Sequence, residues 1–476
     1  MNNRYENPLN TRYTGKEMSE LFSADTKFKM WRTIWIALAE SQKECGLNIK
    51  EEQIEELKKF KDHINYEDAE RREKETRHDV MSHVYAYGLQ CPKAKGIIHL
   101  GATSAFVGDN TDLIVMRQAL ILLRKKLANL LYNLGEFAKK YKDMPTLGFT
   151  HFQPAQLTTV GKRATLWMMD FLLDYQEIEN VIHHLCLRGV KGTTGTQASF
   201  LSLFDGDHEK VKELDRLVVK KLGFEKSIPV SGQTYTRKID YRTLSALSAI
   251  GQSVHKMTND IRLLQHLKEV EEPFEKDQIG SSAMAYKRNP MRSERAASLA
   301  RYVMSSTLNG AMTTSTQWFE RTLDDSANRR IVIPESFMAT DAILDICINI
   351  TGGFVVNEKV IHQRIMGELP FMATENIIME AVKKGGDRQE LHERIRVHSM
   401  ESAARVKQEG LDNDLLSRIV KDDIFNLTQE DMDKLMSPEL FIGRSSEQVT
   451  EFIEEHIQPI LAKHQDELGL KIDLNV

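Results

Sequence analysis

The sequence predicts an all-α fold whose centre is a bundle of long helices. Only 11 prolines and 26 glycines occur among the 476 residues, and they cluster between long uninterrupted segments. Inside these segments apolar residues recur every three or four positions, which is the spacing of one buried helix face. Hydrophobic residues make up 41% of the chain and charged residues 28%, so the chain can bury the core that such a bundle needs.

Five segments carry the helical spacing over long distances. We expect these helices at about 112–141, 161–187, 237–268, 293–323 and 334–350. The third contains a heptad-like seam, formed by Leu247, Ile250, Val254, Met257, Ile261 and Leu264. Helices of about 30 residues reach about 45 Å. Because one chain rarely covers rods of that length, we expect homo-oligomerisation through this seam.

Shorter helices are expected on both sides of the long ones. Polar stretches separate them before residue 104, and glycine breaks such as KKGGD (383–387) separate them after residue 356. The chain therefore divides into an N-terminal helical domain (1–103), a central long-helix bundle (104–356) and a C-terminal helical domain (357–476).

Charge and cysteine content exclude several classes of function. The 64 basic and 69 acidic residues are interspersed and leave a net charge of −5, so no basic field indicates nucleic acid. No apolar stretch of roughly 18 residues and no apolar N-terminal segment occur, so we expect neither membrane insertion nor export. The four cysteines are far apart and form no CxxC pair, which argues against a disulfide framework or a zinc site. We expect a cytoplasmic protein.

Two polar segments offer acid–base groups. In RHDVMSHV (77–84), the imidazole of His78 lies next to Asp79, which can hold it in one tautomer near neutral pH, although a capped helix start explains the pattern equally well. In TLGFTHFQPAQ (146–156), His151 lies in a non-helical segment and is a candidate acid or base.

Three further segments could bind an anion. QWFERTLDDSANRR (317–330) carries Arg321, Arg329 and Arg330 in a turn-like step between helices, which suits a phosphate or carboxylate, and its alternative is a solvated corner. GVKGTTGTQAS (189–199) could present backbone N–H groups or form a tight turn. NTRY near the start of the chain offers weaker candidates.

The loop GSSAMAYKRNP (280–290) combines hydroxyls with cations. A serine can remove a proton from carbon only if nearby cations and oriented N–H groups stabilise its alkoxide. Lys287, Arg288 and the amides of the loop could do so, and they could also stabilise the charge of a carbanion next to a carboxylate. The loop therefore indicates an elimination reaction.

GSSxMxxKxNP, a THxQPAQ-type histidine segment and GATS (101–104) together resemble the fumarase/aspartase superfamily. Within it the chain resembles the adenylosuccinate lyase family, in the form found in animals, from about Arg12 to about Arg444. The matching segments are RHDVMSHV, HLGATSAFVGDN, THFQPAQLTTVGKR, SGQTYTRK, SSAMAYKRNPMRSER, WFERTLDDSANRR and ELPFMATENI. The resemblance implies a three-domain homotetramer with one large helical bundle and with active sites assembled from three subunits.

The resemblance also implies an activity without cofactor or metal. Family members split adenylosuccinate into AMP and fumarate, and succinylaminoimidazole carboxamide ribotide (SAICAR) into the free carboxamide (AICAR) and fumarate. By motif, Ser281 matches the general base and His151 the general acid. The supporting catalytic positions are His78, Lys287 and Glu294. The matching substrate-binding positions are Arg12, Tyr13, Arg77, His78, Asp79, Thr103, Ser104, Thr150, Gln233, Arg295, Arg321, Ser326 and Arg330.

One residue departs from the family signature, because Ala285 stands where the signature has proline. Compared with proline, alanine lowers the free energy of the open, disordered loop relative to the ordered loop by about 0.4–1 kcal/mol. We therefore expect altered loop closure with the chemistry retained. Two other functions stay open at this level: a sister lyase acting on argininosuccinate or on fumarate and malate, which would not need the phosphate-binding arginines, and a structural protein without activity.

Overall fold

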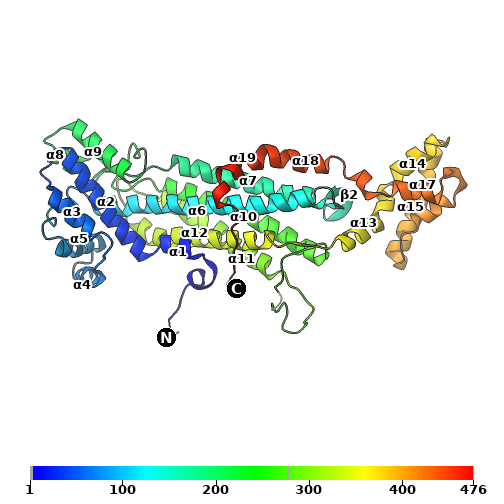
Figure 1. The fold of residues 1–476 in the computed structure, drawn as a ribbon, viewed down its shortest axis with the longest axis horizontal. Helices are drawn as coiled ribbons and strands as arrows, with labels where there is room; N and C mark the ends of the chain where they lie inside the picture. The colour runs from blue at the N-terminus through cyan, green and yellow to red at the C-terminus, as the bar shows by residue number, and fades with distance from the viewer. Residues whose placement is uncertain (1–3, 276–277, 475–476) are drawn as a thin grey trace.

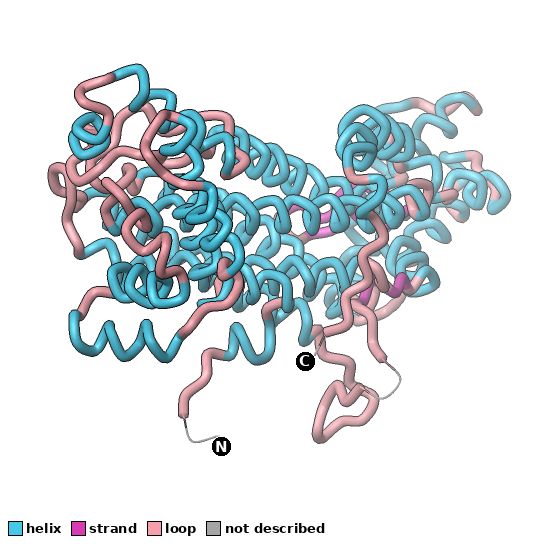
Figure 2. The backbone as a smooth tube through the Cα atoms, turned by 60° about the vertical axis from the view of Figure 1, so that its left-hand side comes forward, coloured by secondary structure: helices cyan, strands magenta, loops and turns pink. Residues whose placement is uncertain are grey.

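The computed structural model describes residues 4–275 and 278–474, and it confirms the all-α fold. Figures 1 and 2 show an elongated molecule with long helices at its centre and smaller helical groups at both ends. Within the described residues, β-structure is limited to two short strand pairs and one isolated bridge between Leu187 and Ser227. Strand β1 (Pro145–Thr150) pairs with β2 (Gln153–Thr159), and β3 (Val270–Glu271) pairs with β4 (Val355–Val356), both antiparallel.

Five long helices form the central bundle, as expected. They are α6 (Ser104–Lys140), α7 (Val160–His184), α10 (Lys238–His266), α11 (Met291–Ser315) and α12 (Asp324–Thr351). Helix α10 packs against α11, α7 and α12, and α6 packs against α7 and α12. Their apolar faces merge into one core with the apolar residues of the two ends.

The first long helix begins eight residues before its expected start. Its N-cap is Thr103, and the polar run GDNTD lies inside the helix. The reason is tertiary, because the buried side chains of this run have partners elsewhere. Asn110 donates from Nδ2 to the carbonyl of Gly189 (3.2 Å), and Asp109 accepts the N–H of Tyr235 (2.9 Å).

The last long helix begins ten residues before its expected start, at Asp324. The expectation of a turn-like step over 317–330 is therefore wrong for Ser326 to Arg330, which lie in the first two turns of α12. Asp324 and Asp325 favour a helix start here, because carboxylates are stabilised at the positive end of a helix. Pro334, which was expected to start the helix, lies inside it.

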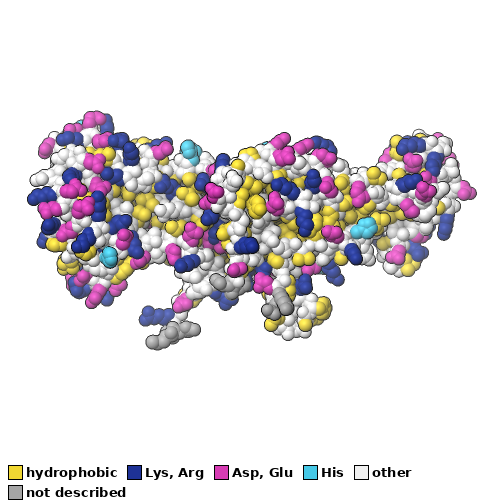
Figure 3. All heavy atoms as spheres, in the orientation of Figure 1, with side chains coloured by type: hydrophobic (Ala, Val, Ile, Leu, Met, Phe, Trp, Pro, Cys, Tyr) yellow, Lys and Arg dark blue, Asp and Glu magenta, His cyan; other side chains and the backbone are white. Residues whose placement is uncertain are grey.

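The heptad-like seam of α10 is buried within its own chain. Each of its six side chains is at most 4% exposed, because α7, α11 and α12 cover it. The expectation that copies associate through this seam is therefore wrong. Large apolar side chains are exposed elsewhere on the bundle, where Figure 3 shows hydrophobic atoms at the surface.

The N-terminal group comprises α1 (Lys16–Leu21), α2 (Ala24–Glu44), α3 (Glu51–Lys59), α4 (Tyr66–Thr76) and α5 (Asp79–Gln90). Two later helices, α8 (Ala198–Leu203) and α9 (His208–Lys221), join it, and α9 packs on α2. Lys221 fixes this contact through ion pairs with Glu44 (2.8 Å) and Glu40 (3.4 Å).

The opposite end is formed by α13 (Glu358–Met372), α14 (Thr374–Lys383), α15 (Arg388–Glu409), α16 (Leu415–Val420) and α17 (Gln429–Leu435). Helices α18 (Ser445–Phe452) and α19 (Gln458–Lys463) then return to the central bundle, where α18 packs on α7. The N–H of Leu470 donates to Asn129 of α6 (2.9 Å). Helices α13 to α17, which follow residue 357, form a separate group at this end of the molecule. The last part of the chain, from α18 onward, packs with the central region. No helix among the described residues is long and apolar enough to cross a membrane.

Candidate active site

A cavity of about 850 Å³ lies between the N-terminal group and the central bundle. This volume is within the usual range for small-molecule sites. Four helices direct their N-termini at it, since its lining includes the N-caps Ser23 of α2, His78 of α5 and Leu323 of α12, together with Ser104, the first residue of α6. Helix N-termini carry partial positive charge and free N–H groups, so the cavity favours an anionic ligand.

The segment from Arg77 to Asp79 presents its side chains to this cavity. Arg77 ends α4 in a left-handed conformation (φ 58°), which turns the chain into α5. The Nδ1 atom of His78 accepts the N–H of Met81 (3.3 Å), so the neutral imidazole carries its proton on Nε2. The side chain of His78 is half exposed, which leaves this N–H available to a ligand.

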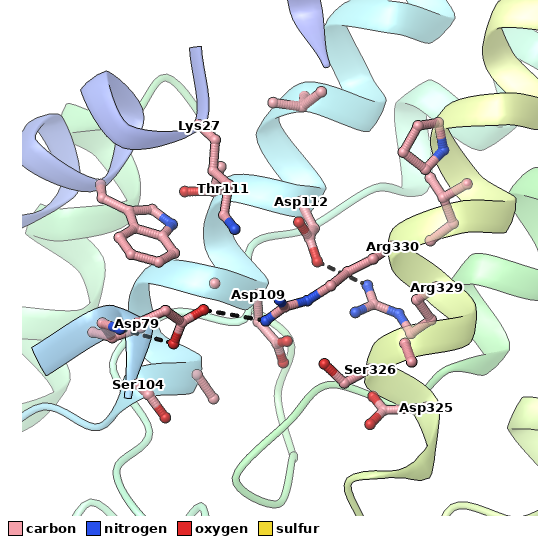
Figure 4. Close-up of a pocket in the computed structure, with 18 of the residues that line it drawn as sticks. Lys27, Asp79, Ser104, Asp109, Thr111, Asp112, Asp325, Ser326, Arg329 and Arg330 are labelled. Carbon is pink, nitrogen blue, oxygen red and sulfur yellow. Dashed lines mark hydrogen bonds and ion pairs between the residues drawn. The ribbon is translucent and has the colours of Figure 1, made fainter. Parts of the chain in front are cut away.

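Asp79 is held by two donors. Its Oδ1 accepts the N–H of Val80 (2.8 Å), and its Oδ2 accepts a hydrogen bond from Arg330 (3.2 Å), as Figure 4 shows. Burial alone would raise the pKa of Asp79. The Val80 N–H and the charges of Lys27 and Arg330 outweigh burial, and the pKa lies below its ordinary value. Asp79 is therefore a carboxylate that orients Arg330 at the edge of the cavity.

At the wall of the cavity, a buried ionic network joins the N-terminal ends of α6, α10 and α12. Arg237 donates to Asp325 (2.7 Å) and Asp109 (3.1 Å), and Arg329 donates to Asp240 (2.5 Å). Breaking such a network leaves uncompensated buried charge, so it holds the three helices in one arrangement. The sequence pattern placed Arg329 with the candidate anion-binding arginines. In the structure its guanidinium is instead paired with carboxylates of the chain, so Arg329 stabilises the fold.

Seven of the catalytic and substrate-binding positions that the family resemblance implies line the cavity. They are Arg77, His78, Asp79, Ser104, Arg321, Ser326 and Arg330. Two more lie next to lining residues: Thr103 is the N-cap of α6, and the N–H of Gln233 donates to the carbonyl of Glu320 (2.9 Å). The cavity therefore collects one group of the expected substrate-binding residues.

His151 lies at the opposite end of α6. It occupies the tip of the β1–β2 hairpin, where His151 (φ 53°) and Phe152 (φ 56°) are both left-handed and Thr150 pairs with Gln153. A two-residue turn of this kind usually contains glycine or asparagine, so the backbone is strained at the candidate acid. The 37 residues of α6 separate the hairpin from Ser104 by about 55 Å. Within one chain, His151 therefore cannot act on a ligand in the cavity.

Ser281 lies in a third place, on the loop between β3 and α11 that extends from the bundle in Figures 1 and 2. Its Oγ accepts the N–H groups of Met284 (3.2 Å) and Ala283 (3.4 Å). Gly280 lets the two ends of the loop approach, since a Cβ there would lie 2.2 Å from the carbonyl oxygen of Lys287. The 25 residues of α11 separate this loop from the segment of Arg321 by about 37 Å.

The remaining expected residues lie near the start of α11. Glu294 approaches Arg262 of α10 (4.0 Å), and the guanidinium of Arg295 lies over the ring of Tyr13 (5.9 Å). Tyr13 follows Arg12 in a short helical turn (Leu9–Tyr13) that packs on α12. Lys287 is exposed on the serine loop. One chain therefore carries three separate groups of candidate residues.

Several residues that line the cavity could not be identified from the sequence. Lys27, Trp31, Asp109, Asp112 and Asp325 all face the cavity. Most belong to helices whose ends meet only through packing, and no local pattern marks them. Lys27 carries one local signal: no acidic residue lies three or four positions from it, whereas Lys29 has Asp25 at four.

Comparisons with known proteins agree with this architecture. A family model described as Lyase matches residues 16–305, and one described as Adenylosuccinate lyase C-terminus matches residues 370–452. Among solved structures, a fumarate lyase from Mesorhizobium sp. BNC1 has a TM-score of 0.78 at 20% identity, covering 95% of this chain and 100% of that one. The long-helix fold is therefore that of the lyase class.

The sequence relatives are more specific. Adenylosuccinate lyase from Saccharomyces cerevisiae is 53% identical over 479 residues, which cover 99% of both chains. The enzyme of the same name from Schistosoma mansoni is 48% identical over 474 residues, again covering 99% of both chains. The chain belongs to the adenylosuccinate lyase family.

Proposed function

We propose that this protein releases fumarate from adenylosuccinate, giving AMP, and from SAICAR, giving AICAR. The observation that carries the proposal is the 53% identity to a protein named adenylosuccinate lyase over 99% of both chains. The cavity supports it, because four helix N-termini and several arginines suit the phosphate of a nucleotide. No cofactor is part of the proposal.

Ser281 is the proposed general base. Its Oγ removes a proton from the succinyl carbon adjacent to the carbon that bears the departing nitrogen. The electron pair of the broken carbon–hydrogen bond forms the carbon–carbon double bond of fumarate, and the carbon–nitrogen bond breaks with its electron pair going to the nitrogen. Two N–H groups already point at Oγ, which favours the alkoxide. We assign Lys287 to the negative charge that develops beside the carboxylate, and Glu294 to orienting the site.

His151 is the proposed general acid, which protonates the departing nitrogen. An imidazole can donate this proton near neutral pH. The hairpin presents His151 at an exposed tip, where another copy of the chain can use it. For the substrate we assign Arg12, Tyr13, Arg321, Ser326 and Arg330 to the nucleotide and phosphate, with His78 between Arg77 and Asp79 beside them. Thr103, Ser104, Gln233 and Arg295 are assigned to the succinyl group or the base, with Thr150 next to His151.

The proposed assembly is a homotetramer in which three chains complete each site. It is supported by the separation of about 55 Å between the cavity and His151, which one chain cannot close. Exposed apolar side chains at helical spacing on α7 offer a surface for association: Leu166 (53%), Met169 (43%) and Leu173 (53%). A cytoplasmic location is part of the proposal and rests on four cysteines that are free thiols.

Fumarate release tests the function directly. Loss of the succinyl group changes the purine absorbance, so turnover of adenylosuccinate is followed in the ultraviolet, with argininosuccinate and malate as substrates of the sister lyases. Ser281→Ala is expected to lower kcat by about 100-fold or more. Ser282→Ala, on the exposed neighbour, is the matched control and is expected to keep most activity. Wild-type turnover in Ser281→Ala would contradict the base assignment.

A further inference from the structure

Lys27 is a half-buried cation that faces the cavity without a carboxylate partner. It lies in the first turns of α2, and Figure 4 shows its side chain extending into the cavity toward Asp79 and Asp112. Among the described residues, no carboxylate oxygen lies within 4.0 Å of its Nζ. Asp79 is occupied by Arg330 and Asp112 by Arg329.

Aromatic rings hold the ammonium group in place. Its Nζ lies 4.9 Å from the ring centre of Trp31 and 5.2 Å from that of Phe28. These cation–π contacts position the charge, but they leave the three N–H donors of the ammonium without an acceptor in the part of the chain that the structure describes. The donors are therefore free for a ligand in the cavity.

The surroundings of Lys27 are electrostatically unfavourable for a lone cation. Burial lowers its pKa, and the nearby charge of Arg330 lowers it further, while Asp79, Asp112 and Glu73 oppose this shift in part. The positive end of α2 adds to the repulsion, since cations are disfavoured at a helix N-terminus. An anion bound in the cavity would relieve this repulsion, whereas a purely structural role for Lys27 would not.

We propose that Lys27 is a further substrate-binding residue, which contacts the phosphate monoester of the nucleotide. This inference rests on the proposed function, which supplies the nucleotide. A phosphate dianion matches a site with four helix N-termini and an unpaired ammonium, because lysine binds phosphate as a point charge. In the proposed mechanism the carboxylates of the succinyl group flank the reacting carbon, which Ser281 reaches from its separate loop.

Binding of product by the full-length wild-type protein and its variants tests the proposal without relying on turnover. Affinities for AMP and for adenosine are measured by calorimetry. Lys27→Met is expected to weaken the binding of AMP by about 10- to 100-fold and to leave the affinity for adenosine unchanged. Lys27→Arg, which keeps the charge, is expected to restore most of the AMP affinity.

Lys29→Met is the matched control on the same helix, because Lys29 pairs with Asp25 (2.9 Å) on the exposed face. In steady-state assays of Lys27→Met, KM for adenylosuccinate is expected to rise by the same factor as the AMP dissociation constant, with kcat little changed. Circular dichroism of each variant checks that α2 stays folded.

Three results would overturn the proposal: unchanged AMP affinity in Lys27→Met, an equal loss for AMP and adenosine, or a loss of fumarate affinity in place of AMP affinity. The last would assign the lysine to a carboxylate. Failure of the proposed function is separate. If the wild-type protein releases no fumarate from adenylosuccinate but AMP still binds through Lys27, the reaction assignment fails and the phosphate contact stands.

Discussion

Asp174 is a buried carboxyl group whose ionisation the fold opposes. It lies on α7, where burial raises its pKa to about 7 and the charge of Asp170 adds to the shift. A hydrogen bond with Ser253 of α10 lowers the pKa in part, but Oδ2 has no hydrogen-bond partner among residues 4–275 and 278–474. The protonated form is therefore favoured in the folded state.

This shift predicts a pH dependence of stability. Because the folded pKa lies above the ordinary value for aspartate, the folded chain binds more protons than the unfolded chain between about pH 4 and pH 7. The contribution of Asp174 to the free energy of unfolding is fully present below about pH 4 and is lost as the pH rises through about 7. Asp174→Asn is expected to remove this loss and to be more stable than wild type at pH 8, by about 1–3 kcal/mol.

Urea unfolding at pH 5 and pH 8, at equal chain concentration, measures the effect. Asp170→Asn is the control, since Asp170 is partly exposed and pairs with Lys256 (2.5 Å). Asp170→Asn is expected to change the free energy of unfolding by no more than about 0.5 kcal/mol. If the pH curves of Asp174→Asn and wild type run parallel, Asp174 is not the group responsible.

At the scale of elements, three loops pack together because glycines let their backbones touch, and the third leads to Arg321 of the cavity. A Cβ on Gly195 would lie 1.7 Å from the carbonyl oxygen of Ser231, and one on Gly232 would lie 2.5 Å from that of Glu320. Gly195 also has φ +81°, which favours glycine. Since no residue of 189–199 lines the cavity, the tight-turn interpretation of this glycine-rich run fits better than an anion cradle.

Gly232→Ala is expected to move the segment that carries Arg321. The added methyl group has to displace the backbone of Glu320, so KM for adenylosuccinate should rise by about 10-fold or more, with a smaller change in kcat. Gly367→Ala is the control, because Gly367 lies in α13 with nothing within 4 Å of a Cβ. The free energy of unfolding of this control variant is expected to rise by up to about 1 kcal/mol, and its activity is expected to stay unchanged. Normal kinetics in Gly232→Ala would show that the loop stack tolerates the shift.

The serine loop contains a turn that suits proline. The N–H of Lys287 donates to the carbonyl of Met284 (3.0 Å), which places Ala285 second in a four-residue turn. Proline is favoured at this position because its fixed φ matches the turn. Ala285 therefore leaves the turn intact and removes only the restriction on the open loop.

Ala285→Pro is expected to stabilise the ordered loop, relative to its open state, by about 0.4–1 kcal/mol. Amide hydrogen exchange over 280–290 should slow, and turnover should change with it, because in the proposed mechanism loop closure brings Ser281 to its substrate. Amide exchange and kcat are measured on the same preparation. No change in either quantity would remove the idea that Ala285 controls closure.

At the scale of the whole molecule, the three groups of candidate residues can meet only between chains. The cavity, the hairpin with His151 and the loop with Ser281 lie at separate positions along the rod, as Figure 1 shows for their elements. A rod of parallel helices keeps its ends apart whatever its side chains do. An active site that uses all three groups therefore requires neighbouring copies.

This arrangement predicts complementation between inactive variants. If Ser281 and His151 of one site come from different chains, mixing Ser281→Ala with His151→Ala and allowing subunits to exchange should restore about one quarter of wild-type activity, since half of the serines and half of the histidines are intact. A mixture of Ser281→Ala with the double variant should stay inactive. Continued inactivity of the first mixture, after exchange is verified, would place both residues in one chain.

The helices and the residue types of the site could be read from the sequence, because both depend on neighbours a few positions apart. The apolar spacing located all five long helices, and motifs with serine, histidine and arginine indicated an elimination reaction. Their ends were less predictable. Asn110 and Thr111 are residue types that can cap a helix start, yet the distant partners of Asn110 at Gly189 and of Asp109 at Tyr235 hold this run inside α6.

Tertiary structure alone decided which residues meet. It covers the apolar seam of α10 within the chain, commits Arg329 to a buried network, and brings Lys27 of α2 to the same cavity as Arg330 of α12. The physical reason is that helical periodicity is a local property of the chain, whereas burial, ion pairing and the field of converging helix ends arise only when faces distant in sequence pack together.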